Sequence, residues 1–393
     1  MVTRQITREL VESAQEYPVV AVFGPRQSGK TTLVQMTFPD KPYRSLEDPD
    51  VRIAAETDPR GFLTALPDGA ILDEIQQLPL LLSYIQGEVD RRKQNGMYIL
   101  TGSHQPELHQ AISQSLAGRT AVLSLLPFSL PELRAYHSAW QAFDLAVKGG
   151  FPRLHEQGLD PYRFYNGYLQ TYLERDVRAM ISLKDLGRFQ QFLTLLAGRV
   201  SQVINFTSLS NDVGVSAMTI KSWVSVLNAS FVVFELQPYF ENIRKRVVKS
   251  PKIYFTDTGL VCHLLGINSA EQVLRDPLRG ALYENLLILE ILKHRLNHGK
   301  RAELFFYRDT HGNEVDLIIR EGRKLYPIEI KSAATFTPDF LKGIERFRKI
   351  VSERVASGAV LYNGNETFQV KGSRVLNFFR HDVLLGEAVI QPL

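Results

Sequence analysis

Short apolar runs alternate with helical stretches through the first third of the chain. The apolar runs are bounded by turn residues and are typical of buried strands. We predict strands at 18–23, 42–46, 69–73, 97–102 and 120–125. Strands that alternate with helices form an open parallel sheet with helices on both faces. Residues 1–135 are therefore expected to form one α/β domain, and residues 136–188 a helical connector.

A different pattern starts near residue 189. A helix at 189–202, a short helix, a turn containing Gly214, Ser216 at an N-cap position and a longer helix suggest a helix-turn-helix. Two strand-like runs follow, and they would supply the wing of a winged helix; they are 231–236 and 252–255. We predict a winged-helix-like domain over 189–257.

The last third of the chain predicts a second α/β unit, over 258–393. A helix runs from about residue 280 to 296, and three strands with tight turns follow, at 303–308, 314–320 and 325–332. Because side chains alternate along a strand, Glu314 and Asp316 share one face of their strand. Glu329 and Lys331 share one face of the next strand, opposite an apolar core face that includes Ile328.

Composition limits the cellular setting. The chain has 393 residues, enough for two or three domains with cores of their own. Its single cysteine, Cys262, excludes an intramolecular disulfide and a cysteine-built zinc site, which fits a reducing compartment. No window approaches the roughly 20 apolar residues of a membrane span. We expect a cytoplasmic protein without membrane contact, and the net charge of +4 permits nucleic acid without requiring it.

The segment after the first predicted strand matches the phosphate-binding pattern G-x-x-x-x-G-K-[ST]. Glycines let the backbone N–H groups point at an anion, and the helix that follows adds its positive dipole end. Lys30 would reach the β and γ phosphates, and Thr31 would ligate Mg²⁺. The expected nucleotide-binding residues are Gly24, Pro25, Arg26, Gln27, Ser28, Gly29, Lys30, Thr31 and Thr32.

Further candidates for nucleotide chemistry follow the other strands. Asp73 and Glu74 end a buried strand, where Asp73 would hold Mg²⁺ through water and Glu74 would polarise the attacking water; an acidic turn is the alternative. Ser103, or less favourably Thr101, could bind the γ-phosphate or that water, although a plain Ser/Gly turn also fits. Arg119 is a candidate for the transition-state charge, in cis or across a subunit boundary, and equally fits a surface arginine.

A second set of polar residues lies on the C-terminal strands. Asp316 and Glu329 could bind Mg²⁺ or Mn²⁺, Lys331 could activate water, and Glu284 could complete the site from the preceding helix. The arrangement D-x12-E-x-K resembles the PD-(D/E)XK nuclease fold, a restriction-endonuclease-like α/β fold, although Val315 replaces the usual proline. A retained but inactive nuclease fold and a solvent-facing hairpin remain open.

Basic residues near the predicted winged helix could neutralise the phosphates of double-stranded DNA. The alternative is a module that packs on other domains and keeps a basic loop in solvent. The candidate DNA contacts are Lys221, Arg244, Lys245, Arg246, Lys249 and Lys252.

Nearly the whole chain resembles prokaryotic ATP-binding proteins that pair an AAA-type ATPase domain with a C-terminal domain of unknown function bearing a nuclease-like core. Besides the phosphate-binding segment and the C-terminal strands, the motifs that carry this resemblance are Leu72-Asp73-Glu74, Leu100-Thr101-Gly102-Ser103, Leu116-Ala117-Gly118-Arg119, Gly149-Gly150-Phe151-Pro152, Tyr172-Leu173-Glu174-Arg175-Asp176 and Lys249-Ser250-Pro251-Lys252-Ile253-Tyr254. The resemblance implies ATP binding and hydrolysis, and it names no substrate.

Three functions follow from these patterns. The leading hypothesis is an ATPase whose nucleotide state positions the winged helix and the nuclease-like domain. The second is a slow regulatory switch that binds a protein partner and keeps an inactive nuclease fold. The third is a metal-dependent DNA nuclease regulated by ATP. Oligomerisation is compatible with all three.

Overall fold

The structure is a computed structural model that describes residues 2–103, 112, 114–137, 141–173, 185–239, 249–351 and 354–377, with only the backbone of 172 and 173. Three of the candidate DNA contacts, Arg244, Lys245 and Arg246, lie outside these residues, as does the motif segment 174–176.

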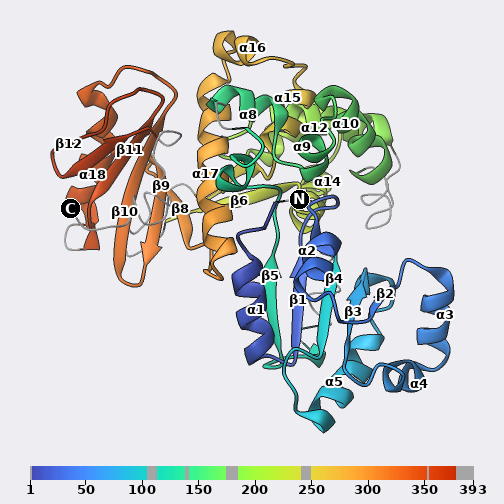
Figure 1. The fold of residues 1–393 in the computed structure, drawn as a ribbon. Coiled ribbons are helices and arrows are strands. Elements are labelled where there is room, and N and C mark those ends of the chain that lie inside the picture. The colour runs from blue at the N-terminus through green and yellow to red at the C-terminus, as the bar shows by residue number, and fades with distance from the viewer. Residues whose placement is uncertain are drawn as a thin grey trace.

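The first domain is built on a five-stranded parallel sheet with the order β2-β3-β4-β1-β5 (Figure 1). Its strands are β1 Val19–Phe23, β2 Tyr43–Ser45, β3 Ala70–Asp73, β4 Tyr98–Gly102 and β5 Thr120–Ser124. All five predicted strands are confirmed to within one or two residues. β1 is buried along its whole length, as expected for a central parallel strand covered on both faces.

Helices cover both faces of this sheet, as the sequence predicts. Alternate residues of β1 enter two different cores, because successive side chains of a strand point to opposite faces. Val20 and Val22 pack with Leu10 of α1 and Leu33 of α2, whereas Val19 belongs to the core that contains α5. The helices are α1 Thr7–Glu16, α2 Lys30–Thr37, α3 Pro49–Thr57, α4 Pro59–Thr64 and α5 Leu81–Arg92, with a 3₁₀ turn η1 at Ile75–Gln77.

A helical region follows the first sheet. It comprises α7 Leu130–Leu133, α8 Ala142–Lys148, α9 Pro152–Glu156, α10 Pro161–Tyr168, the π-helical turn η2 Leu169–Leu173, α12 Leu186–Ala197, α13 Phe206–Val213 and α14 Ala217–Ala229. α13 and α14 lie at the positions of the predicted helix-turn-helix, with Gly214 in the left-handed conformation between them and Ser216 capping α14. Trp223 packs against Phe189 and Phe192 of α12.

The strands predicted as a wing belong to the sheet of the C-terminal region. β6 Val233–Pro238 pairs antiparallel with β7 Lys252–Phe255 and parallel with β8. The resulting eight-stranded sheet has the order β12-β13-β11-β10-β9-β8-β6-β7. Its other strands are β8 Leu304–Arg308, β9 Glu314–Glu321, β10 Lys324–Lys331, β11 Gly358–Tyr362, β12 Phe368–Val370 and β13 Ser373–Leu376. The sheet therefore crosses residue 257, the predicted boundary between two domains.

One long helix, α17 Arg279–Asn297, stands between the C-terminal sheet and the helical region (Figure 1). It is buried on most sides, and a single hydrophobic core extends from Leu126 to Leu376 around it. The remaining helices are α15 Thr258–Leu264, α16 Ala270–Arg275, η3 Pro338–Leu341 and α18 Lys342–Val351. Among the residues described, no helix combines the length and apolar content that crossing a membrane requires.

Candidate functional site

The segment between β1 and α2, which the sequence predicts to bind phosphate, forms a loop at the carboxyl edge of the first sheet; we call it the phosphate loop. Gly29 caps α2 with φ +90°, a conformation that side chains rarely adopt. Gly24 lies so close to the end of β5 that a Cβ on it would be 2.0 Å from the carbonyl oxygen of Leu125. Both glycines are therefore required by the backbone path. The first N–H groups of a helix have no partner within it, so the start of α2 is compatible with the anion site that the sequence predicts.

Lys30 lies inside this loop. Its buried ammonium group donates hydrogen bonds to the carbonyl oxygens of Gly24, at 3.0 Å, and Pro25, at 2.9 Å. The side-chain oxygens of Gln27 and Ser28 are buried and have no hydrogen-bond partner among the residues described. Buried polar atoms normally have partners, so these two oxygens fit a loop that surrounds a polar ligand.

Asp73 joins the loop to the neighbouring strands. Its carboxylate is buried at the end of β3 and accepts hydrogen bonds from Thr31 Oγ1 at 2.9 Å and from Tyr43 OH at 2.7 Å. Thr101 Oγ1 donates to the other carboxylate oxygen. Burial and the adjacent Asp73 carboxylate raise the pKa of Tyr43 above its usual range. The two predicted Mg²⁺ ligands, Thr31 and Asp73, are thus in direct contact, and a hydroxyl with a carboxylate is an oxygen donor set suited to this ion.

Glu74 and Ser103 are linked through a residue that the sequence did not identify. Gln76 Nε2 donates to a carboxylate oxygen of Glu74 and to Ser103 Oγ, the latter at 3.1 Å. Glu74 has a left-handed backbone, with φ 56° and ψ 48°, and strained backbone of this kind is frequent at active sites. Gln76 lies two positions after the acidic pair, and this proximity was the one local signal that could have identified it.

The structure does not bring Arg119 to the loop. Arg119 precedes β5, whose first residue pairs with Val19, the first residue of β1. It therefore lies at the amino edge of the sheet, about 15 Å along the strands from the loop at roughly 3.3 Å per residue. Its guanidinium pairs with the Asp90 carboxylate at 2.5 and 2.9 Å. The predicted action on the nucleotide of its own chain is therefore wrong, and an action on a neighbouring subunit stays a prediction.

A cavity of about 200 Å³ lies beside the loop. Its lining includes Arg4, Gly29, Thr32, Phe128 and Pro152. The cavity thus borders both the end of the phosphate loop and the first turn of α2, and it has a largely apolar wall.

The wall that contains Pro152 is fixed by a buried carboxylate. Asp257 accepts hydrogen bonds from Gly150 N at 2.7 Å and from Tyr165 OH at 2.6 Å. The motif Gly149-Gly150-Phe151-Pro152 therefore holds one side of the cavity in place. The structure gives this motif a position that its sequence alone did not indicate.

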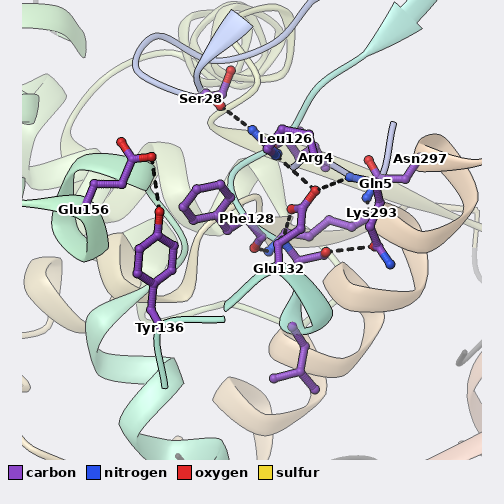
Figure 2. A network of polar contacts seen from close by, with 12 residues as sticks. Arg4, Gln5, Ser28, Leu126, Phe128, Glu132, Tyr136, Glu156, Lys293 and Asn297 are labelled. Carbon is purple, nitrogen blue, oxygen red and sulfur yellow. Dashed lines mark hydrogen bonds and ion pairs between the residues drawn. The ribbon is translucent and has the colours of Figure 1, made fainter. Parts of the chain in front are cut away.

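Arg4 connects the loop to the segment after β5 (Figure 2). Its side chain is 7% exposed, and Nη1 donates to the carbonyl oxygen of Ser28 at 2.7 Å. Nη2 donates to the carbonyl oxygen of Leu126 at 2.7 Å, and Nε pairs with Glu132 at 3.0 Å. No local pattern marked Arg4, because all of these contacts join positions that are far apart in the sequence.

The predicted nuclease residues lie together on the C-terminal sheet. Lys331 Nζ is 2.9 Å from Asp316 and 2.6 Å from Glu329, on adjacent strands β9 and β10. Glu284 reaches the same region from α17, where its carboxylate accepts hydrogen bonds from Tyr254 OH at 2.6 Å and Lys252 Nζ at 3.0 Å. We call this set of side chains, together with Glu314, the C-terminal cluster.

Lys252 belongs to this cluster and is not on the surface. It is 2% exposed, and its ammonium group also pairs with Glu314 at 2.5 Å. The prediction that Lys252 contacts DNA is therefore wrong, because all four residues of β7 are buried. Of the other described candidates, Lys221 is exposed on α14 with Nζ 5.5 Å from the Phe206 ring, and Lys249 is exposed before β7.

Burial and the neighbouring charges shift the pKa values of the C-terminal cluster in opposite directions. Burial raises the pKa of Glu284 to about 7 against the opposing effect of Lys252. Burial, with Asp316 nearby, raises the pKa of Glu329 well above its usual value. Burial also acts to raise the pKa of Asp316, but Lys331 and Lys252 outweigh it and keep that pKa low. Both lysines have raised pKa values, because the carboxylates outweigh the effect of burial.

Among the residues described, no three His, Cys, Asp or Glu side chains form a group arranged to hold a metal ion. The cluster is instead an arrangement of carboxylates interleaved with the ammonium groups of buried Lys252 and partly exposed Lys331.

Comparisons with known proteins place the chain in a family. A family model described as AAA domain matches residues 16–134, and two models of domains of unknown function, DUF8612 and DUF4143, match residues 140–271 and 279–379. Uncharacterized proteins of Mycobacterium tuberculosis and Mycobacterium bovis are each 30% identical over 378 residues, covering 95% of this chain and 82% of theirs. A Walker-type ATPase of Pyrococcus abyssi is similar with a TM-score of 0.46 and 16% identity, over 67% of this chain and 97% of its own. The chain belongs to the family of the two mycobacterial proteins, and its N-terminal domain is an AAA-type P-loop ATPase domain.

Proposed function

We propose that this protein binds ATP with Mg²⁺ at residues 24–32 and hydrolyses it. The observation that carries the proposal is the contact between Thr31 and Asp73, 2.9 Å apart although 42 positions separate them in the sequence. A P-loop hydroxyl and a strand-end carboxylate hold Mg²⁺ together in P-loop NTPases. The match of the AAA family model to residues 16–134 supports the same assignment.

Each side chain has a defined part in this proposal. Lys30 would exchange its bonds to the carbonyl oxygens of Gly24 and Pro25 for phosphate oxygens. Thr31 and Asp73 would hold Mg²⁺, which supplies positive charge against the phosphates when bound. Glu74, oriented by Gln76, would accept a proton from the attacking water. The cavity lined by Thr32 and Phe128 would take the nucleoside.

Nucleotide binding is tested by titrating a fluorescent ATP analogue with Mg²⁺. Lys30→Ala should weaken binding by at least tenfold, because it removes the buried ammonium group from the loop. Lys324→Ala is the matched control, since Lys324 is exposed at the start of β10 and should leave affinity unchanged. Equal affinity of Lys30→Ala and wild type would remove the phosphate site from this loop.

For the output of the ATPase, we infer that nucleotide state acts on the helical region and the C-terminal sheet. α13 and α14 would contact double-stranded DNA through the exposed face that carries Lys221, and the exposed Lys249 would supply a second phosphate contact. Fluorescence anisotropy with a labelled duplex at low and high salt tests this contact. Binding that is unchanged in the Lys221→Ala/Lys249→Ala double variant would rule it out.

The C-terminal cluster favours a nuclease-like fold that does not cut, a feature of the second of the functions above. The ammonium groups of buried Lys252 and partly exposed Lys331 already pair with its carboxylates, and they would repel a divalent cation entering there. Incubating plasmid and linear DNA with Mg²⁺ or Mn²⁺ should therefore give no cleavage by wild type or by Lys331→Ala. Cleavage by wild type that is lost in Lys331→Ala would establish the third function instead.

A further inference from the structure

Arg4 links the phosphate loop to the segment 126–132 through one buried guanidinium. It contacts the carbonyl oxygen of Ser28 in the phosphate loop, the carbonyl oxygen of Leu126 after β5, and the carboxylate of Glu132. Its guanidinium carbon also lies 4.9 Å from the centre of the Phe128 ring. A movement of the loop at Ser28 would therefore change the hydrogen bonds that hold the segment 126–132.

The segment 126–132 is in turn held by α17. The carbonyl oxygen of Phe128 accepts a hydrogen bond from Lys293 Nζ at 2.8 Å, and Leu130 N donates to Glu290 Oε2 at 2.6 Å. Lys293 and Glu290 pair with each other at 2.7 Å, and both are buried (Figure 2 shows Lys293). Buried charged hydrogen bonds of this kind cost much free energy to break, so the segment and α17 should move together.

The other end of α17 holds β7 and the C-terminal cluster. The Glu284 carboxylate binds Tyr254 and Lys252, as described above, and Asn285 bonds both backbone groups of Phe255, at 2.8 and 2.9 Å. From Glu284 to Lys293 the helix rises about 14 Å, at 1.5 Å per residue. A packed helix transmits a displacement over this length as a rigid body.

We propose that Arg4 is a positioning residue through which nucleotide in the phosphate loop alters α17 and, through α17, β7 and the C-terminal cluster. This inference rests on the proposed nucleotide binding. The ligand of this coupling is the phosphate group of the nucleotide, because Ser28 is the loop residue whose carbonyl Arg4 holds. Coupling requires that the contacts differ between the free and bound states, and typical couplings change an equilibrium by about 5- to 150-fold.

Hydrogen exchange of the full chain, with and without a non-hydrolysable ATP analogue, measures this coupling. In wild type the analogue should change exchange rates in α17 and β7 by about fivefold or more. The double variant Glu290→Leu/Lys293→Met removes both bonds to the segment and both charges together, so no charge is left buried alone. It should bind the analogue with unchanged affinity and lose the response in α17 and β7.

The positioning role of Arg4 is tested by two substitutions of Arg4 itself, with a substitution of nearby Arg8 as the control. Arg4→Gln should weaken the response in α17 and β7 by more than it weakens nucleotide affinity, and Arg4→Lys should restore part of it. Arg8→Gln is the control, because Arg8 pairs with Glu12 on the exposed face of α1, and Lys300→Met is the exposed control for Lys293.

The outcomes separate the coupling from the nucleotide site. A wild-type protein that binds the analogue but shows no change in α17 overturns the coupling while the proposed function stands. A response that persists in Glu290→Leu/Lys293→Met also overturns it, because α17 would then respond by another route. A wild-type protein that binds no analogue removes the proposed function itself.

Discussion

Replacing Glu74 with glycine should separate catalysis from stability. Glu74 has φ 56° and ψ 48°, a left-handed conformation that costs a residue with a Cβ about 1 to 2 kcal/mol and that glycine adopts freely. Two effects oppose this relief of strain. Glycine loses about 0.5 to 1 kcal/mol more in backbone entropy on folding, and the hydrogen bond from Gln76 to the carboxylate, about 1.5 kcal/mol for a charged acceptor, is lost.

These contributions nearly cancel, so the free energy of unfolding of Glu74→Gly should stay within about 1 kcal/mol of wild type. The rate of ATP hydrolysis should fall by about 100-fold or more, because a positioned general base contributes about 10² to 10⁴ to a rate. Urea unfolding followed by circular dichroism measures the first quantity, and phosphate release measures the second.

Lys93 supplies the matched control for Glu74→Gly. It is an exposed non-glycine residue with φ 54° and ψ 38° at the end of α5, where glycine is the preferred residue. Lys93→Gly should raise the free energy of unfolding by about 0.5 kcal/mol and leave ATP hydrolysis unchanged. A Glu74→Gly protein that unfolds much more easily than wild type but hydrolyses ATP at the wild-type rate would refute both the strain and the catalytic role.

Two further predictions follow from the packing. Gly24→Ala places a Cβ 2.0 Å from the Leu125 carbonyl oxygen, so thermal unfolding should show a free energy of unfolding lower by about 2 kcal/mol or more, and nucleotide binding should weaken. Gly87→Ala is the control, because its Cβ on α5 would enter open space, and it should stabilise the protein by about 1 kcal/mol. A Gly24→Ala protein as stable as this control would contradict the clash. Burial lowers the pKa of His155 in the folded protein to about 4. Between about pH 6.5, the ordinary pKa of histidine, and about pH 4, the unfolded chain therefore binds a proton at His155 that the folded protein does not bind. The free energy of unfolding should fall by up to about 3 kcal/mol as the pH drops through this range. Urea unfolding at about pH 7 and about pH 5 measures this fall in the free energy of unfolding, which should be smaller in His155→Gln than in wild type. His311→Gln is the control, because His311 is exposed, and its fall should match that of wild type. A fall in His155→Gln as large as in wild type would contradict the role of His155 burial.

Local pattern was sufficient for the first sheet and its loop. Three of the five strands, β1, β3 and β4, are largely apolar and buried along their whole length, as interior parallel strands require. The loop motif fixes its own geometry through Gly24 and Gly29. Asp73 was predictable because the carboxyl ends of parallel strands meet at one edge of a sheet. These features depend on neighbours in the sequence or on a topology that the alternation of elements already implies.

Contacts between distant segments were not predictable in the same way. Arg4 meets Glu132 across 128 positions, and no periodicity marks either residue. Lys252 was assigned to the surface because cations cluster before it, yet β7 is covered on both faces and three carboxylates of the C-terminal cluster offset its charge. The two strands predicted as a wing do not form a separate hairpin, for a related reason. β6 also pairs with β8, and this contact between distant segments could not be read from the local sequence.

The central claim is that residues 24–32, with Asp73 and Glu74, bind and hydrolyse ATP. Its most direct test is steady-state phosphate release from Mg²⁺-ATP by wild type, Lys30→Ala and Glu74→Gln, with and without duplex DNA. Wild type should hydrolyse ATP and either variant should show little or no turnover, although Glu74→Gln should still bind the nucleotide. Turnover at the wild-type rate in Lys30→Ala would contradict the assignment of the ATP site to this loop.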